Sequence, residues 1–406
     1  MSALLESLTQ PQNPLSSETR LQAIRNAGLP GRREEAWRTT PLRAYERRSF
    51  AAATAPSVDA ADIAHIPAPR VVFANGHYVA ELSDLQGSEG QLSIAVGPGN
   101  NAYQIESSPA RFLEDIVEAQ NGQGLNVTVL AGKTAHLHWV NLAQSAEADV
   151  VWHAQHHVQV MEGAKLCLIE HHAGNAGSSH LSNSVCTLRL DANAQCEHLR
   201  VQTLGAAMLS FTSTHASLER GAHYRRLDLE FGAALARHVL DVELRGEDAF
   251  CEAHGVAVAS DKQHLDTRLN VSHIGKNARC DLRWRGIANG RSRIITHGGI
   301  RIRQGADGSD AAFNSRNILL SNTATVESQP VLEIHADEVK AAHGSTVGQL
   351  DSNALFYLRA RGIPEEKARA ILTRAFGNEV IDLIEDSVLA EAANAALATA
   401  MREKTS

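Results

Sequence analysis

Short runs in which apolar and polar residues alternate dominate the middle of the chain. Examples are CTLRL at 186–190, RRLDLEF at 225–231 and LDVELR at 240–245. An alternation of period two is the pattern of a β-strand, whose successive side chains point to opposite faces. The pattern predicts that residues from about 66 to 345 form a series of short strands.

The strands are separated by a turn that recurs along the chain. A repeat of about 28 residues, with two or more strands in each unit, is typical of a solenoid. The six-residue repeat of left-handed β-helices is absent, so the predicted fold is mainly β, with a right-handed parallel β-helix core. The last residues of successive turns are 26 to 30 positions apart and are Ala135, Ala164, Ala194, Ala222, Asp248, Ala278 and Ala306.

Helical patterns flank this core at both ends. Ser17 is a suitable N-cap for a helix that ends near Gly28, and a second short helix is predicted within 33–45. Residues 51–62 are small and polar and read as a linker. We therefore divide the chain into an N-terminal helical region and linker, a β-helix core and a C-terminal helical domain, with the bounds 1–62, 63–348 and 349–406.

The C-terminal pattern predicts amphipathic helices. Pro364 suits the first turn of one helix, and apolar residues then recur at steps of three and four as far as Val388. Gly377 and Asn378 are expected to break this stretch into two helices.

Composition excludes several classes of protein. The 38 Lys and Arg against 46 Asp and Glu give a formal charge of −8, which does not favour nucleic acid or anionic membranes. Aromatic residues make up only 4% of the chain, which argues against grooves that stack sugars or bases. No signal peptide and no apolar stretch of membrane-spanning length is visible. Five scattered cysteines without a CxxC pair argue against disulfides and structural zinc, so a cytoplasmic location is expected.

Histidine clusters raise the question of a metal site. The densest are His153, His156 and His157, followed by His171 and His172. Neighbouring residues on a strand point to opposite faces, so His156 and His157 cannot both reach one ion. Stacking of successive coils could bring His157 close to His171. Hydrogen-bonded imidazoles are the simpler interpretation, and a metal site is the alternative.

Other candidate motifs favour structural roles. The Gly-Lys-Thr at 132–134 is not a P-loop, because Val127 stands where that motif needs a glycine. The acid pairs Asp228/Glu230 and Asp241/Glu243 each share one strand face, which is expected to be solvated. Four cysteines follow the repeat and are expected to form a buried ladder: Cys167, Cys196, Cys251 and Cys280.

Two segments carry a family resemblance. Residues 314–363, NSRNILLSNTATVESQPVLEIHADEVKAAHGSTVGQLDSNALFYLRARGI, resemble the C-terminal core of the SufB/SufD family of iron–sulfur cluster assembly proteins. REEAWRTTPL at 33–42 is similar to the N-terminal Trp-containing motif of the SufD members. No cysteine follows Cys280, which favours the SufD branch over the SufB branch.

The resemblance implies a cytoplasmic, non-enzymatic scaffold. Its β-helix would pair with a SufB-like paralogue, or with a second copy when the chain is alone. No intrinsic cofactor is implied, and iron or a transient Fe–S cluster would lie at the interface with SufB. His343 matches the family histidine at that interface, as an iron or cluster ligand or as a proton-handling group. The family often has a cysteine two residues earlier, where this chain has Ala341.

The resemblance also implies a SufC-like ABC-type ATPase on the C-terminal helices. An amphipathic helix laid in a groove is a common mode of recognition, so the expected contacts are mainly apolar. The residues expected to contribute are Phe356, Tyr357, Leu358, Arg359, Ile363, Ile371 and Phe376.

Two other functions remain open from the sequence. One is a homodimeric structural adaptor without cluster chemistry, because a fold alone does not determine a function. The other is a β-helix enzyme acting on polysaccharides, which would call for secretion and an aromatic groove. Composition disfavours the second.

Overall fold

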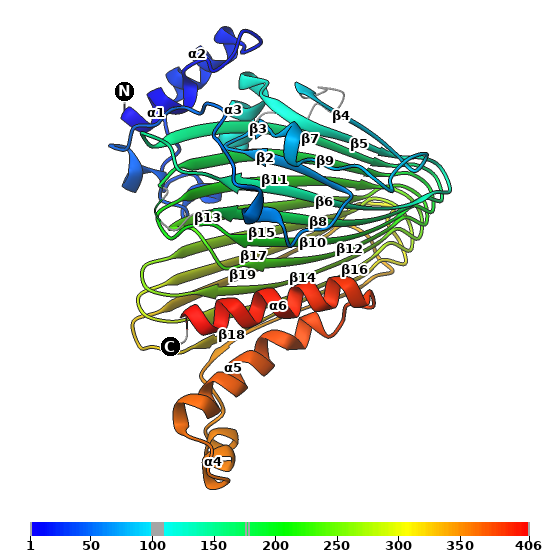
Figure 1. The fold of residues 1–406 in the computed structure, drawn as a ribbon. Coiled ribbons are helices and arrows are strands. Elements are labelled where there is room, and N and C mark those ends of the chain that lie inside the picture. The colour runs from blue at the N-terminus through cyan, green and yellow to red at the C-terminus, as the bar shows by residue number, and fades with distance from the viewer. Residues whose placement is uncertain (1, 99–108, 175–176, 178, 405–406) are drawn as a thin grey trace.

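The computed structural model describes residues 2–98, 109–174, 177 and 179–404. Two long sheets face each other and form a parallel β-solenoid with helices at both ends (Figure 1). Each regular coil contributes one strand to each sheet, and successive coils pair in parallel. The prediction of a mainly β, parallel solenoid between helical ends is confirmed.

The first sheet, sheet 1, holds the odd-numbered strands of the regular coils. The short β1 pairs with β7 beside the main order, and β4 pairs antiparallel with β5. The strands of sheet 1 are β1 (Ala51–Ala52), β4 (Leu92–Pro98), β5 (Gln123–Val129), β7 (Val150–Val160), β9 (Leu181–Leu190), β11 (Leu209–Leu218), β13 (Leu235–Leu244), β15 (His264–His273), β17 (Arg293–Ile302) and β19 (Thr325–Ile334).

The second sheet, sheet 2, faces sheet 1 across the core. It begins with the antiparallel pair of β2 and β3 and then continues in parallel. Its strands are β2 (Arg70–Ala74), β3 (His77–Tyr78), β6 (Thr134–Ala143), β8 (Lys165–Gly174), β10 (Gln195–Thr203), β12 (His223–Glu230), β14 (Phe250–Ala259), β16 (Arg279–Ala288), β18 (Asp310–Leu319) and β20 (Lys340–Gly348).

The coils are unequal in length and on average slightly longer than predicted. The residues directly paired from coil to coil in sheet 2 are Thr134, Lys165, Gln195, His223, Phe250, Arg279, Asp310 and Lys340. In this register Ala249, and not Asp248, is the equivalent of Ala222. The turn series predicted from the sequence was also displaced at two other coils, because Lys133 and not Ala135 is the equivalent of Ala164, and Ser309 and not Ala306 is the equivalent of Ala278.

The turns stack because each carries one residue in the left-handed backbone region. Gly163, Asn193, Gly221 and Asp248 have φ between 56° and 64°. The backbone N–H of each donates to a carbonyl of the next coil, as in Asn193 to Arg220 at 2.8 Å. Asn and Asp tolerate this conformation better than other non-glycine residues, which explains the composition of the turns.

A substitution at Asn193 tests this account of the turns. Asn193→Val should destabilise the protein by about 1–2 kcal/mol, because the left-handed region is costly for residues with a Cβ and worst for β-branched ones. Asn193→Gly should remain near wild type. Urea unfolding of the two variants measures the difference, and equal midpoints would contradict the turn explanation.

Helices occupy the ends of the chain and one insertion. They are α1 (Ala3–Thr9), α2 (Glu18–Ala27), α3 (Phe112–Gln120), α4 (Ser352–Ala360), α5 (Glu365–Ile381) and α6 (Ser387–Lys404). Single 3-10 turns occupy Glu35–Trp37, Leu42–Tyr45, Ala60–Ile63, Ala80–Leu82 and Pro109–Arg111. Ser17 occupies the N-cap position of α2 and Gly28 the C-cap position, as predicted, but the side chain of Ser17 makes no capping hydrogen bond.

Three sequence-based expectations about these elements were wrong. The α3 helix lies inside the range expected to hold only strands, and the regular coils begin at β5. The helix expected within 33–45 is instead two 3-10 turns, because Pro41 restricts the residue before it and Thr40 bonds a carboxylate of sheet 1. The α5 helix runs through Gly377, where a Cβ would lie 3.0 Å from the Leu397 side chain, so this glycine serves close helix packing.

The N-terminal motif is anchored to sheet 1 by buried charged groups. The hydroxyls of Thr39 and Thr40 both donate to the carboxylate of Asp266. The guanidinium of Arg237 lies 4.1 Å from the centre of the Trp37 ring and donates to the carbonyl of Ala36. These contacts explain why the REEAWRTTPL segment combines a large aromatic residue with two threonines.

The α5 and α6 helices cover the outer face of sheet 2. Leu227, Leu229 and Phe231 on that face pack with Val380 and Leu389 of the helices in one buried cluster. The outer face of β12 and its neighbours is therefore apolar, as the inner, packed face of a sheet is in a β-sandwich. Both faces of sheet 2 are covered at this level.

Candidate functional site

The solenoid has an open end at its last coil. Among the residues that the structure describes, strand β19 pairs only with β17, and β20 pairs only with β18. The other edge of each strand presents backbone groups that a further strand can pair with. Apolar side chains are exposed on the same two strands, with Val331 48%, Ile334 42% and Val347 47% accessible. An uncapped edge with exposed apolar residues is a typical docking surface.

His343 lies in the middle of β20, at this open end. It pairs in register with Phe313, which is buried in the core between the sheets. Because side chains repeat every second residue and stack from coil to coil, His343 occupies the inner-face register of the last coil. It is exposed because no further coil covers it. Within the part of the chain that the structure describes, no side chain or backbone group hydrogen-bonds to its ring, so both ring nitrogens are available.

His335 provides a contrast at the same end. Its ring bonds the carboxylate of Glu333 at 2.7 Å, and Arg301 bonds that carboxylate at 2.7 Å as well. All three side chains lie at the surface. His335 is thus part of a surface ion-pair group.

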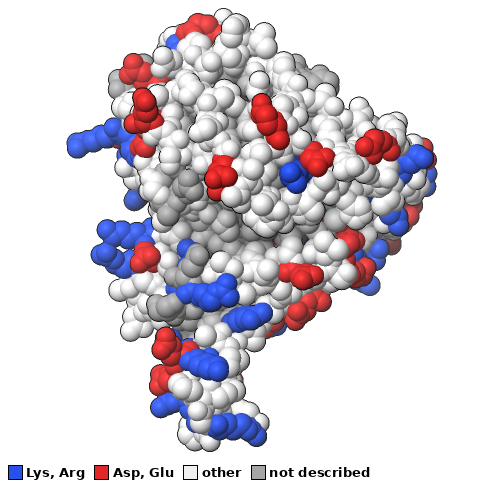
Figure 2. Space-filling view, viewed as in Figure 1, with Lys and Arg blue, Asp and Glu red and all other residues white. Residues whose placement is uncertain are grey.

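The α4 helix forms an arm that projects beyond the last coil (Figure 1). None of its residues is buried, and Phe356 and Tyr357 are 72% and 56% accessible. The guanidinium of Arg361 lies 3.8 Å from the centre of the Tyr357 ring. Arg359 pairs with Glu365 at 3.2 Å. Figure 2 shows Lys and Arg together with Asp and Glu on this arm, so charges of both signs surround its aromatic residues.

The other residues predicted to bind a partner occupy different environments. Leu358 and Ile363 are half-buried, and Ile371 on α5 is exposed. Phe376 packs against the apolar cluster beneath α5 and α6, with the Arg285 guanidinium 6.0 Å from its ring centre. Phe376 thus contributes to holding α5 on the solenoid, whereas Phe356, Tyr357 and Ile371 face solvent.

The histidines that lie close together in the sequence are separated by the coils. His156 is buried and accepts from the backbone N–H of Leu125 at 3.0 Å, while His157 contacts Thr187. His172 points inward to Glu170. His171 lies on the outer face and contacts His138 on β6, so stacking of the coils does not bring His157 close to it. The simpler interpretation, hydrogen-bonded imidazoles, holds for these residues.

The cysteine ladder is partly confirmed. Cys196, Cys251 and Cys280 occupy one inner column of sheet 2, with Tyr224 between the first two. Cys167 lies one position off this column, on the outer face. Burial raises the pKa of Cys167 and of Cys251 to about 12, so these thiols are protonated at neutral pH.

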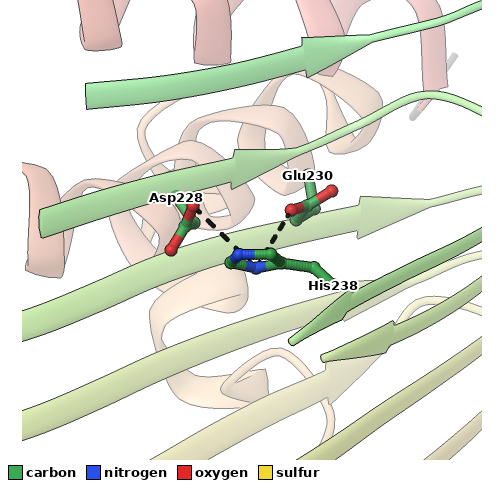
Figure 3. Close-up of side chains that lie close together, drawn as sticks. All are labelled: Asp228, Glu230 and His238. Carbon is green, nitrogen blue, oxygen red and sulfur yellow. Dashed lines mark ion pairs between the residues drawn. The ribbon is translucent and has the colours of Figure 1, made fainter. Parts of the chain in front are cut away.

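A buried charged network lies inside the solenoid and was missed from the sequence. Asp228 and Glu230 do share a face of β12, but it is the inner face and not a solvated one. Figure 3 shows both carboxylates pointing toward His238 of β13, whose Nδ1 is 3.9 Å from Asp228 Oδ1 and 3.6 Å from Glu230 Oε1. These three side chains together have the composition of a metal site.

The surroundings of this trio favour ion pairing over metal binding. Arg226 donates to both Asp228 oxygens at 2.8 Å and also to His238 Nε2 at 3.1 Å, and Arg200 donates to Glu230. An imidazole that accepts at Nε2 carries its proton on Nδ1, the nitrogen that faces the carboxylates. Two guanidiniums and an N–H therefore already occupy the positions that a cation would need.

Comparison with known proteins decides the family. A sequence model described as "SUF system FeS cluster assembly, SufBD core domain" matches residues 142–376. This chain belongs to the SufBD family. The matched span includes β20 with His343 and the whole α4 arm, so both candidate surfaces lie within the SufBD core.

Individual relatives of this SufBD protein agree with the assignment. The iron–sulfur cluster assembly protein SufD of Escherichia coli strain K12 is 28% identical over 92% of this chain and 89% of its own length. An iron–sulfur cluster assembly SufBD family protein of Synechocystis is 25% identical over 88% of this chain and 84% of its own. Protein ABCI7, chloroplastic, of Arabidopsis thaliana is 29% identical over 55% of this chain and 48% of its own. The chain is a SufD homologue and an iron–sulfur cluster assembly protein.

None of the helices in the described ranges is long and apolar enough to cross a membrane.

Proposed function

We propose that this chain is a SufD-like scaffold subunit of a SufB–SufC–SufD complex in the cytoplasm. Its open solenoid end pairs with a SufB-like paralogue, and its C-terminal helices carry a SufC-like ATPase. The chain itself catalyses no step and supports iron acquisition and cluster formation at the subunit interface. The observation that carries the proposal is an exposed, unbonded His343 between two unpaired strand edges.

The strand edges support pairing with a second solenoid. A partner solenoid that continues β19 or β20 would satisfy their free backbone groups and cover Val331, Ile334 and Val347. A paralogue with the same coil repeat has strands of matching length. Because His343 occupies the inner-face register, such a partner would enclose its imidazole and supply further ligands.

To act as a metal ligand, the imidazole of His343 must meet two conditions. It must be neutral, and a neighbour must hold the second ring nitrogen. The chain has Ala341 two positions earlier, so in this proposal no cysteine from β20 joins His343. Iron or a cluster is the cargo of this site, and the partner's side chains complete its coordination.

His343→Ala tests the proposed role. The variant should fold and should still co-purify with SufB-like and SufC-like subunits, but the assembled complex should hold several-fold less iron and acid-labile sulfide. His335→Ala is the matched control, because His335 sits at the same end and bonds only surface groups. Metal and sulfide analysis of the three co-expressed complexes makes the comparison.

The outcomes separate the candidate functions. Equal cluster content in His343→Ala and wild type would exclude the ligand role. Exclusive purification as a homodimer, even with partners co-expressed, would favour the structural adaptor without cluster chemistry.

A further inference from the structure

A pair of imidazoles faces outward on the first regular coils, far along the chain from His343. His138 on β6 and His171 on β8 belong to neighbouring parallel strands, and His171 is paired in register with Val140. The inner face of β6 at this level is formed by Leu137 and Trp139, so His138 lies on the outer face. Both histidines are partly accessible.

The two rings are within hydrogen-bonding distance of each other. His138 Nδ1 lies 3.1 Å from His171 Nε2, and the ring centres are 5.5 Å apart with planes tilted by 17°. Two nitrogens bound to one ion at about 2.0–2.1 Å are about 2.9 Å apart at a right angle and about 3.4 Å apart at the tetrahedral angle. The observed separation falls between these two values.

The protonation state of the pair suits coordination. Burial is the main cause that lowers the pKa of His138, and it lowers that of His171 to about 3 with a contribution from His138. Both rings are therefore neutral at physiological pH. A metal ion would not have to displace a proton from either ring, although one ring must change tautomer.

Two further histidines lie near the pair without contacting it, because no third His, Cys, Asp or Glu among the described residues places a ligand atom within 4.8 Å of both ring nitrogens. His136 precedes His138 by two residues on the same outer face and is exposed, and its charge acts on the pKa of His138. His65, also exposed, acts in the same way on His171. The nearby Arg70 donates to the carbonyls of Leu82 and Ile66, at 2.9 Å each, so its guanidinium is already hydrogen-bonded.

We propose that His138 and His171 form a surface site for a divalent transition-metal ion, with water completing its coordination and His65 or His136 joining it after a change of side-chain rotamer. Ligands that are all imidazole and water suit zinc, nickel, copper or iron and not magnesium or calcium. The site differs from the buried trio of Figure 3, where guanidiniums hold the carboxylates. It is also independent of the cluster function proposed for His343.

Cobalt binding tests the site. The full chain, without a histidine tag, is titrated with Co²⁺ and followed by visible absorption, and Zn²⁺ is then added as competitor. Wild type should bind one Co²⁺ that Zn²⁺ displaces. The double variant His138→Gln/His171→Gln should bind at least ~10-fold more weakly. Single His65→Gln and His136→Gln variants identify the third ligand by a smaller loss.

The control is His223→Gln. His223 is also partly accessible and outward-facing, but it bonds Glu252 at 2.8 Å and stacks on Phe250, so its loss should leave Co²⁺ affinity unchanged. Equal affinity in wild type and the double variant would overturn the proposal, as would the absence of a Co²⁺ spectrum in wild type.

A measurement on wild type alone keeps the proposal testable if the double variant does not fold. Diethyl pyrocarbonate modifies accessible imidazoles, and the modified positions can be mapped by mass spectrometry. Zn²⁺ should protect His138 and His171 while leaving His335 reactive. Equal modification with and without Zn²⁺ would show that the pair is only hydrogen-bonded.

Discussion

Replacing Arg226 with methionine should destabilise the protein by about 3–5 kcal/mol, the range for leaving a buried charge without its partner. Arg226 is 1% accessible, donates to both oxygens of Asp228 and also bonds Tyr224 and Thr214. Without it, the Asp228 carboxylate remains buried between the sheets with little compensation. Urea unfolding of the two proteins measures the loss.

Two further variants separate this explanation from a simple loss of volume. The double variant Arg226→Met/Asp228→Leu should recover most of the stability, because replacing a buried ion pair with apolar residues is often neutral. Arg245→Met breaks a pair of the same spacing with Glu243 on the surface, and should cost less than about 1 kcal/mol. A double variant as unstable as Arg226→Met would contradict the charge explanation.

The pH dependence of the Arg226→Met defect follows from the same contacts. Burial alone would raise the pKa of Asp228, but the charge and the hydrogen bonds of Arg226 lower it to about 2. In wild type this depressed pKa contributes stability above the ordinary value of 3.8, which is lost as the pH falls toward 2. In Arg226→Met the carboxyl titrates at higher pH. The difference in stability between the two proteins should therefore be largest at neutral pH and should narrow in acid.

The same strand shows what the sequence can and cannot predict. The alternation in RRLDLEF at 225–231 correctly predicts a strand and correctly places Asp228 and Glu230 on one face. It does not say which face is inside. Apolar Leu227, Leu229 and Phe231 face outward because α5 and α6 cover them, so the charged residues fill the interior. That choice depends on tertiary packing between segments that lie far apart in the chain.

The candidate site likewise has features that the sequence predicts and features that it does not. The position of His343 at the end of the solenoid could be predicted, because the strand repeat stops there and a helical pattern begins. Its exposure and inner-face register needed the pairing with Phe313. The contact between His138 and His171 was missed because it depends on which residues of two coils stack, and coils of unequal length shift that register.

Phe356 and Tyr357 should be central to binding the SufC-like ATPase in the proposed complex. They are the most exposed aromatic residues of the arm, and buried aromatic anchors often contribute about 2 kcal/mol or more to an interface. The double variant Phe356→Asp/Tyr357→Asp should therefore bind the ATPase at least ~30-fold more weakly, which is the change in dissociation constant that corresponds to that free energy.

Surface variants of α4 test this docking better than removal of residues 349–406. Truncation would also strip α5 and α6 from Leu227, Leu229 and Phe231 and would expose an apolar face of the solenoid. The α4 residues are not buried, so the double aspartate variant should keep the thermal stability of wild type.

The binding measurement compares the double aspartate variant with wild type and with Leu15→Asp. Leu15 is 57% accessible and lies between α1 and α2, and Figure 1 shows these two helices at the opposite end of the molecule from α4. Its replacement therefore adds an acidic group without touching the arm. Calorimetric titration with the purified ATPase should give wild-type affinity for Leu15→Asp and a loss only for the α4 variant. If the α4 variant binds as tightly as wild type, the ATPase contacts another surface, and the exposed apolar side chain of Ile371 on α5 is the next position to substitute.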